Sequence, residues 1–523
     1  MIDLNERHLE KRSFFNRLLL VYLFFGAAFL FILYKTYSLQ VAGYSNYEIA
    51  ALKNKTKEVL VQPVRGIIYD RNGNILVNNV PTYDLIIQPS KIKNLDAFIV
   101  ELSKIINFSP EELENINKNF QQKALYNREL TIRKDLSKEE IAKFQVRSYK
   151  FKNAFIDVRY SRENRYPYLF SHAIGYVGGV NNDQLSSILE KQKLKQSETT
   201  FKYSGGFLIG KTGLENIYDS HLRGSFGIKS IEIDAKGKLL KEVGFDKSID
   251  GKSLFTSLDL SSQKIAYDQM GERRGAVVAL DLQTGGIVTY LSTPSFNVND
   301  LSNGMSQAAF NNLINDKNKP FFDRAAQGRY SPASTIKPAI ALFGIKESIV
   351  DWNFTIDDPG FFVLPEDQRV YRGWKKGGHG IINMRDAIIE SSNTFFFSLA
   401  YQSDINSLID HLAQFGFGRN ICNDCFNPDS GLLPTPEWKM NNLNYGWFKG
   451  DTVNLGVGQG YMSATPIQLA YYSGFLASKG SIQGLSFING ETQNKQSFKS
   501  SLSVDDSDWE KIHSSMIGVI EDP

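Results

Sequence analysis

The feature that most constrains this chain is an uncharged, apolar stretch near its start. Residues Leu18–Tyr34 contain no Asp, Glu, Lys or Arg and lie between Arg17 and Lys35. This is close to the length of a membrane-spanning helix, and flanking basic side chains extend the reach of such a helix by snorkelling. The alternatives are a buried core helix or a cleaved signal peptide. An all-apolar core helix is unusual at an N-terminus, and the stretch is long for a signal sequence and lacks a clear cleavage site. We therefore predict a transmembrane helix over residues 18–36.

The flanking charges predict the orientation of this helix. Basic residues cluster before the stretch, whereas Lys35 is followed by no other basic residue until Lys53. By the positive-inside rule, residues 1–17 form a cytoplasmic tail and everything after the helix lies outside the cytoplasm. The sequence thus predicts a single-pass membrane protein with its bulk outside the cytoplasm, remote from cytoplasmic nucleotides. The clustered basic residues are Arg7, Lys11, Arg12 and Arg17.

Composition adds two constraints. The 523 residues suffice for several domains, and a net charge of +3 from 59 basic and 56 acidic residues indicates no nucleic-acid partner. The two cysteines, Cys422 and Cys425, form one C-x-x-C pair. Such a pair can be half a zinc site, a redox motif or a local disulfide. Because no second pair accompanies it, we predict a local disulfide or two idle thiols.

The pattern before residue 250 predicts a β-rich segment with a helical insertion. Residues 37–57 have the pattern of a helical stalk. Asn72-Gly73 separates two β-rich runs and predicts a hairpin turn. Residues 90–150 are polar with helical spacing and predict a solvated helical insertion. Residues 205–212 match G-x-x-x-x-G-K-[ST], but bulky residues inside the loop and its external location favour a structural turn over a phosphate-binding loop.

A second pattern begins near residue 251. Residues 275–281 and 287–291 are strand-like and are joined by a glycine-containing loop. Helical stretches then dominate from about residue 306 to residue 479. Strands followed by helices predict an α+β domain in which a sheet packs against a helical body.

Residues 330–338 (YSPASTIKP) carry the candidate nucleophile. If Pro332 opens a helix, then Ser334 and Lys337 share one face, and the amine lies beside the hydroxyl. An amine so placed can act as a base for the serine. The spacing is weak evidence alone, because Ser90 and Ser261 also begin S-x-x-K matches.

A second element supports this serine. The chain has six histidines and neither H-E-x-x-H nor G-x-S-x-G, so a serine enzyme built from it would use lysine as its base. Ser391 and Asn393 follow in an S-x-N arrangement at the end of an apolar helix. There Ser391 could pass a proton from Lys337 to a leaving group, and the Asn393 amide could hold a substrate carbonyl and fix Lys337.

The ordered motifs resemble those of the class B penicillin-binding proteins over nearly the whole chain. Several segments favour the elongation type (the penicillin-binding protein 2 group), with the division type (penicillin-binding protein 3) as the alternative. The resemblance to the family rests on residues 65–73, 210–224, 275–296, 334–337, 391–393 and 458–468, and that to the elongation type on residues 374–380, 436–439 and 458–461.

This resemblance implies an elongated, non-catalytic pedestal (dimerisation-like) domain over residues 37–250 and a serine β-lactamase-like transpeptidase domain over residues 251–523. It implies that Ser334 is acylated by peptidoglycan stem peptides or β-lactams, with Lys337 as its base. Ser391 and Asn393 complete the second motif, and no cofactor is implied.

The resemblance also implies partners, namely a glycan polymerase of the SEDS type and the scaffold MreC. Two other functions stay open. One is a β-lactam sensor or an inactive scaffold. The other is a D,D-carboxypeptidase or β-lactamase, which would pass the acyl group to water.

Two departures from the family pattern matter. No K-[ST]-G triplet follows Asn393, and residues 211–213 precede the nucleophile, so we predict that the sequence is C-terminally incomplete. Some relatives carry zinc near the active site. Asp358 and His379 fit two of its ligand positions, but Gly373 and Ser392 stand where an acid and a thiol are needed, so we predict no metal.

Overall fold

The computed structural model describes residues 4–42, 56–125, 129–191, 207–233, 239–482, 484–488 and 498–521. The chain divides into two compact units. The first comprises residues 1–62, 182–205 and 225–249, and the second comprises residues 63–181, 206–224 and 250–523.

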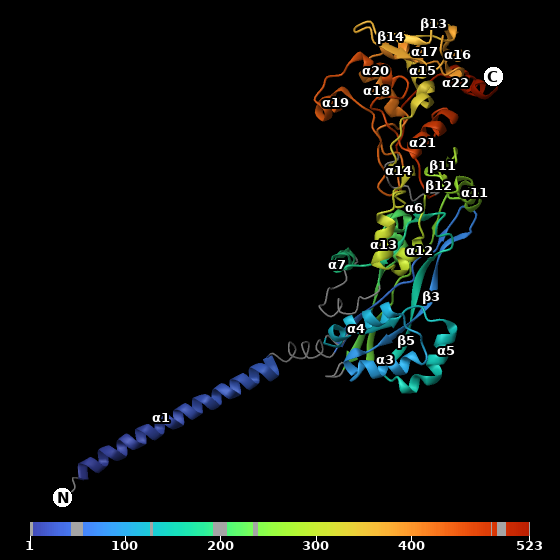
Figure 1. Ribbon diagram of the computed structural model, residues 1–523. Helices are drawn as coiled ribbons and strands as arrows, with labels where there is room; N and C mark the ends of the chain where they lie inside the picture. The colour runs from blue at the N-terminus through green and yellow to red at the C-terminus, as the bar shows by residue number, and fades with distance from the viewer. Residues whose placement is uncertain are drawn as a thin grey trace. The chain divides into compact units, whose positions relative to one another are not determined.

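The first unit contains the predicted apolar helix and a small sheet. Helix α1 (Leu4–Tyr37) continues into a π-helical turn, and residues Phe14–Ala42 are long and apolar enough to cross a membrane (Figure 1). Most of the predicted stalk lies outside the described residues. The unit also holds helix α7 (Asn182–Lys191) and an antiparallel sheet in the order β1-β8-β9, formed by β1 (Thr56–Val61), β8 (Gly227–Ile233) and β9 (Leu239–Asp246).

A five-stranded sheet forms one part of the second unit. The predicted hairpin is present: Gly73 has φ +83°, and the Asp70 carboxylate accepts hydrogen bonds from the backbone N–H groups of Asn72 and Asn74 at 2.9 and 2.8 Å. The strand order is β10-β2-β3-β4, with β5 also paired to β3. These strands are β2 (Ile68–Tyr69), β3 (Ile75–Ile87), β4 (Leu130–Arg133), β5 (Ala154–Asn164) and β10 (Leu254–Phe255).

The insertion predicted as solvated has its own hydrophobic core, so that part of the prediction is wrong. Its helices α3 (Leu95–Ser103), α4 (Pro110–Leu125) and α5 (Lys138–Arg147) place apolar residues on one face, and Leu102 and Phe144 are almost fully buried against strands β3 and β4. The polar composition reflects only the opposite faces of these helices.

A buried charge network joins short elements in the second unit. Glu215, only 1 % exposed, accepts hydrogen bonds at 2.7 Å from the Nε atoms of both Arg65 and Arg162. The Asp219 carboxylate accepts a hydrogen bond from the backbone N–H of Gly210 at 2.9 Å. One backbone N–H of the G-x-x-x-x-G-K-[ST] match thus binds a carboxylate of the chain itself, which favours a structural turn; residues 205 and 206 lie outside the described residues. Arg162 lies on β5, Gly210 on β7 (Leu208–Gly210), Glu215 on α9 (Gly213–Ile217) and Asp219 on α10 (Asp219–Arg223). The same unit contains α6 (Ser171–Ile174) and β6 (Val177–Gly179), and β6 pairs with β7.

The helical body predicted for the second half of the chain is present, with the β11–β12 hairpin against it (Figure 1). Helix α15 runs through the core of this body, and its residues from Lys337 to Gly344 are all buried. The two strands are β11 (Gly275–Leu280) and β12 (Ile287–Thr293). The helices are α11 (Leu260–Met270), α14 (Arg324–Gln327), α15 (Lys337–Lys346), α16 (Met384–Ile389), α17 (Asn393–Gln402), α18 (Ile405–Gln414), α19 (Pro436–Leu443), α20 (Lys449–Leu455), α21 (Pro466–Ala477) and α22 (Asp506–Glu521). Helices α12 (Val298–Asn303) and α13 (Gln307–Ile314) lie apart from this body, and α12 contacts β5 and β6 (Figure 1).

Two further hairpin-like pairs lie within this body. Strand β13 (Thr355–Asp358) pairs with β16 (Gly380–Asn383), and β14 (Phe361–Val363) pairs with β15 (Val370–Arg372), both antiparallel. The β13–β16 pair places Asp358 opposite Gly380, and β16 leads directly into α16. These strands thus bring the end of β13 toward the segment between α16 and α17.

Candidate active site

Residues 330–338 form a 3₁₀ turn followed by an α-helix. The turn covers Ala333–Ile336, and α15 begins at Lys337, so the α-helix starts later than the position predicted at Pro332. In a 3₁₀ helix the side chains at i and i+3 eclipse one another. Ser334 and Lys337 therefore still share a face, with Ser334 exposed and Lys337 only 2 % exposed.

A distant loop holds this turn in place. The carbonyl oxygen of Gly458 accepts hydrogen bonds from the Ala333 N–H at 2.9 Å and from the Ser331 hydroxyl at 2.6 Å. Gly458 has φ +66°, and a Cβ there would lie 2.3 Å from the Ala333 carbonyl oxygen. Ala333 itself has φ +49°. The Gly458 loop therefore supports the backbone that presents the serine, and only glycine fits its closest approach.

The Lys337 amine is bound by the turn that precedes α17. Its Nζ donates to the Ser391 carbonyl oxygen at 2.7 Å and to the Asn393 Oδ1 at 2.8 Å, and it lies 3.1 Å from the Ser391 Oγ. Nζ also lies 5.5 Å from the centre of the Phe396 ring. The structure thus brings Lys337, Ser391 and Asn393 together. Ser334 is exposed and lies in the 3₁₀ turn that precedes Lys337.

Burial makes this lysine a candidate base. Removal of the amine from water lowers the pKa of Lys337 from 10.5 to about 7, although the charge of Asp358 acts in the opposite direction. A neutral amine has two N–H donors and one lone pair. Its donors match the two carbonyl-type oxygens of Ser391 and Asn393, and the Ser391 hydroxyl can donate to the lone pair. The site therefore accommodates both protonation states of Lys337.

The turn that holds these partners has an unusual backbone. Ser391 has φ +53°, in the left-handed region that few non-glycine residues adopt. Ser392 then caps α17, with its Oγ accepting from the Phe395 N–H at 3.2 Å. This conformation directs both the carbonyl and the hydroxyl of Ser391 at Lys337.

The residues at the family's zinc positions do not fit a metal. Ser392 donates its hydroxyl to Asp358 at 2.6 Å, His379 lies 2.7 Å from the same carboxylate, and Gly373 has no side chain to offer. Within the described residues, no three His, Cys, Asp or Glu side chains gather as a metal would require. These residues form a hydrogen-bonded cluster, a role that we had not assigned to Asp358 from the sequence. No local sequence pattern marks this contact, because Asp358 and Ser392 are 34 residues apart in the chain.

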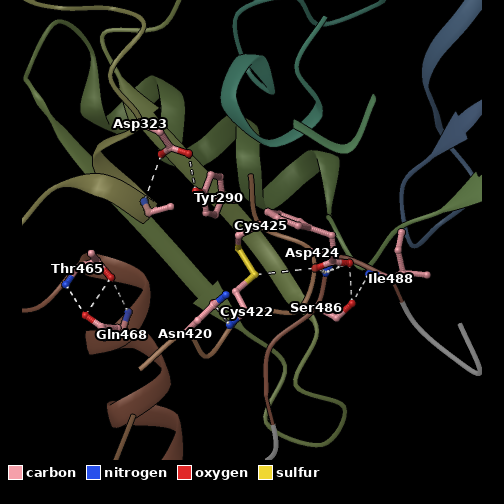
Figure 2. The surroundings of a disulfide bond; sticks show 12 residues. Tyr290, Asp323, Asn420, Cys422, Asp424, Cys425, Thr465, Gln468, Ser486 and Ile488 are labelled. Atoms are coloured by element: carbon pink, nitrogen blue, oxygen red, sulfur yellow. Dashed lines mark hydrogen bonds between the residues drawn. A yellow bond between two sulfur atoms is a disulfide. The ribbon is translucent and has the colours of Figure 1, made fainter. Parts of the chain in front are cut away.

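The cysteine pair forms a disulfide, which confirms the first of the two predicted alternatives. Figure 2 shows it beside Asp424, whose carboxylate points toward Ser486 and accepts the Ser486 hydroxyl at 2.7 Å. Burial raises the pKa of this carboxyl, although hydrogen bonds from Phe487 and Ser486 act against the rise. The disulfide belongs to a buried structural cluster, and neither cysteine is among the residues around Lys337.

Comparison with known protein families places both halves of the chain. Residues 60–256 match the penicillin-binding protein dimerisation domain, and residues 275–523 match the penicillin-binding protein transpeptidase domain.

Individual relatives agree with these matches. The chain is 37 % identical over 490 residues to the peptidoglycan D,D-transpeptidase MrdA of Acinetobacter baumannii, covering 92 % of this chain and 71 % of that protein. The fold resembles that of PBP2 in the complex of PBP2 and MreC from Helicobacter pylori, with a TM-score of 0.72, 28 % identity, and 88 % and 84 % of the two chains covered. It also resembles Pseudomonas aeruginosa PBP2 in complex with WCK 5153, with a TM-score of 0.64, 27 % identity, and 88 % and 80 % coverage.

Proposed function

This chain belongs to the penicillin-binding protein family as an elongation-type homologue of MrdA, and on that premise we propose that it cross-links peptidoglycan stem peptides through an acyl-enzyme on Ser334. The observation that carries the proposal is the buried amine of Lys337, which is bound to Ser391 and Asn393 and follows an exposed serine by three residues in the sequence. A buried lysine amine with a lowered pKa, three residues after an exposed serine, is the arrangement that a serine–lysine nucleophile requires.

The first half of the reaction forms an ester. The neutral Lys337 amine takes the proton of the Ser334 hydroxyl as Oγ attacks the carbonyl carbon between two D-alanines of a stem peptide. The Ser334 backbone N–H donates to the developing oxyanion. When the tetrahedral intermediate collapses, the C–N bond breaks, and Ser391 passes the proton from Lys337 to the departing terminal D-alanine. Asn393 holds Lys337 and the substrate carbonyl.

The second half releases the ester. An amine of a neighbouring stem peptide attacks the acyl carbon and loses a proton, and Ser334 leaves as its hydroxyl. The same acyl-enzyme would form with a β-lactam, because its strained amide mimics the D-alanyl-D-alanine unit and its leaving group stays attached. Attack by water in place of the amine would make the protein a D,D-carboxypeptidase, and the ratio of the two products measures the balance between these activities.

The setting of the reaction follows from the N-terminal helix. We propose a single-pass anchor in the inner membrane with the N-terminus in the cytoplasm and the catalytic domain outside. This is supported by the apolar span Phe14–Ala42 and by the excess of basic residues before it. The likeness to PBP2 in its complex with MreC supports an MreC-type scaffold as a partner, and the family resemblance supports a SEDS-type polymerase.

Labelling with a fluorescent penicillin tests the assignment of the nucleophile. The protein should label covalently, and Ser334→Ala should not. Ser261→Ala is the matched control, since Ser261 is also exposed and also begins an S-x-x-K match. Equal labelling of Ser334→Ala and the unaltered protein would refute the proposed nucleophile.

A further inference from the structure

Asp358 lies buried behind the turn that binds Lys337. It is the last residue of β13 and is 1 % exposed. Its Oδ2 accepts a hydrogen bond from the Ser392 Oγ at 2.6 Å and another from the His379 Nδ1 at 2.7 Å, and its Oδ1 accepts the Gly360 N–H at 2.7 Å. Because a carboxylate only accepts, His379 must carry its proton on Nδ1. Both oxygens of this buried carboxylate are therefore satisfied.

Ser392 connects this carboxylate to the residues around Lys337. Ser392 is fully buried, and its hydroxyl donates to Asp358 while it accepts from the N–H of Phe395 in the first turn of α17. Its two sequence neighbours, Ser391 and Asn393, are the residues that bind the Lys337 amine. A displacement of Ser392 would consequently move both partners of the lysine.

The backbone of the turn needs such a support. Ser391 is in the left-handed region at φ +53°, an unfavourable conformation that persists in a folded protein only where its surroundings fix it. The Asp358–Ser392 hydrogen bond is a short, charge-assisted contact at the residue next to this strained position. It is well placed to supply that restraint.

We propose that Asp358 is a positioning residue for the acylation reaction: acting through Ser392 and by hydrogen bonds alone, without a metal ion, it holds Ser391 and Asn393 against Lys337. The residues that would otherwise complete a metal site are Gly373 and Ser392, and neither supplies a ligand of the required kind. This inference rests on the proposed function, because the acylation that it concerns is the first half of the proposed reaction.

Asp358 also acts on Lys337 through its charge. Burial raises the pKa of the Asp358 carboxyl, but the hydrogen bonds from Ser392 and His379 outweigh it, so the pKa lies below its usual range and the group is charged at neutral pH. That negative charge raises the pKa of Lys337 against the larger effect of burial. Other charged side chains lie near this cluster: the Glu390 Oε2 is 3.8 Å from the His379 Nε2, and Lys375, Arg385 and Asp386 line the same pocket as these two residues.

The two roles can be separated by two variants. Asp358→Asn removes the charge and replaces one of the two acceptor oxygens by an NH2 donor, which cannot accept the hydrogen bonds made to it, whereas Ser392→Ala removes only the link to the turn. We expect both to slow acylation by a fluorescent penicillin by at least roughly tenfold, since small displacements of catalytic groups have effects of that size. Only Asp358→Asn should move the rising limb of the pH profile to lower pH. Asp357→Asn, at the exposed neighbouring carboxylate, is the matched control and should change neither quantity.

Three results would overturn the inference. The first is that Asp358→Asn or Ser392→Ala reacts at the rate of the unaltered protein, and the second is an unmoved pH limb in Asp358→Asn. The third is loss of acylation on chelation that zinc restores, because Asp358 would then serve a metal. If Asp358→Asn does not fold, as judged by thermal unfolding, then Ser392→Ala decides the matter through its rate.

An NMR titration of the Lys337 amine separates this inference from the proposed function, because it requires no acylation. We expect the amine to titrate at lower pH in Asp358→Asn than in the unaltered protein. A shifted titration in a protein that penicillin never acylates would refute the proposed function and with it a positioning role in acylation, while the effect of the Asp358 charge on Lys337 would stand. An unshifted titration in an acylated protein would refute the inference alone.

Discussion

The protonation of Lys337 gives the sharpest quantitative prediction. Burial lowers the pKa of this amine from 10.5 to about 7, and only the neutral form can take the Ser334 proton. The neutral fraction therefore rises roughly tenfold per pH unit below pH 7 and saturates above it, so that acylation at pH 6 should run at roughly a tenth of its plateau rate. For an unperturbed lysine the rate would instead still rise tenfold per unit at pH 9.

Stopped-flow acylation by a chromogenic β-lactam between pH 5.5 and 9 measures this directly. Lys337→Arg is the companion variant, because a guanidinium stays protonated throughout that range and cannot act as a base. We expect this variant to lose about 10²–10⁴-fold in acylation rate at every pH, the usual contribution of a positioned general base. A profile of the unaltered protein that lacks a plateau above pH 7, or a Lys337→Arg variant that keeps the normal rate, would refute the assignment of Lys337 as the base.

Three further predictions concern the site and its support. Asn393→Ala removes one partner of the lysine and should lower the acylation rate in the same stopped-flow assay with no change in the amount of folded protein; an unchanged rate would exclude it from the site. Glu215→Ala leaves two buried arginines without their shared partner and should lower the free energy of unfolding in urea by about 3–5 kcal/mol, while Glu139→Ala, at a surface pair, should cause no measurable change. Burial raises the pKa of Glu215, but the two arginines bring it below its usual value, so this stabilisation should be complete above the ordinary glutamate pKa and should fade as the pH falls. Replacing both Cys422 and Cys425 by alanine should cost about 2 kcal/mol, the value expected for so short a loop, and should leave acylation intact; loss of acylation would place the disulfide in the site.

Features with local causes were predictable from the sequence. Asn72-Gly73 marks a turn because glycine adopts positive φ without strain, and the apolar stretch Leu18–Tyr34 marks a helix whatever its surroundings. The capping Thr465 and the following Pro466 likewise begin α21. In each case the physical cause lies within a few residues of its effect, so a single sequence suffices.

Features that depend on distant contacts were not predictable in the same way. The first turn at Ser334 is 3₁₀ because Ala333, at positive φ, donates its N–H to the carbonyl oxygen of Gly458. No local sequence pattern predicts that hydrogen bond. The composition of residues 90–150 predicts solvated helices, yet the apolar faces of these helices pack together with β3 and β4 in one hydrophobic core.

The active site combines both kinds of feature: the spacing of its motif is local, whereas the pKa of its lysine depends on distant groups. The i, i+3 spacing of Ser334 and Lys337 is local and sets which side chains face one another. The pKa of Lys337 is not local, because it depends on burial by α17 and on a charge supplied by β13. A lysine at the same spacing on an exposed helix, such as Lys264 after Ser261, keeps the geometry and lacks the burial. Reactivity therefore follows from the partners that the fold brings to the motif: Ser391 and Asn393, which bind the amine, and Asp358, whose charge acts on it.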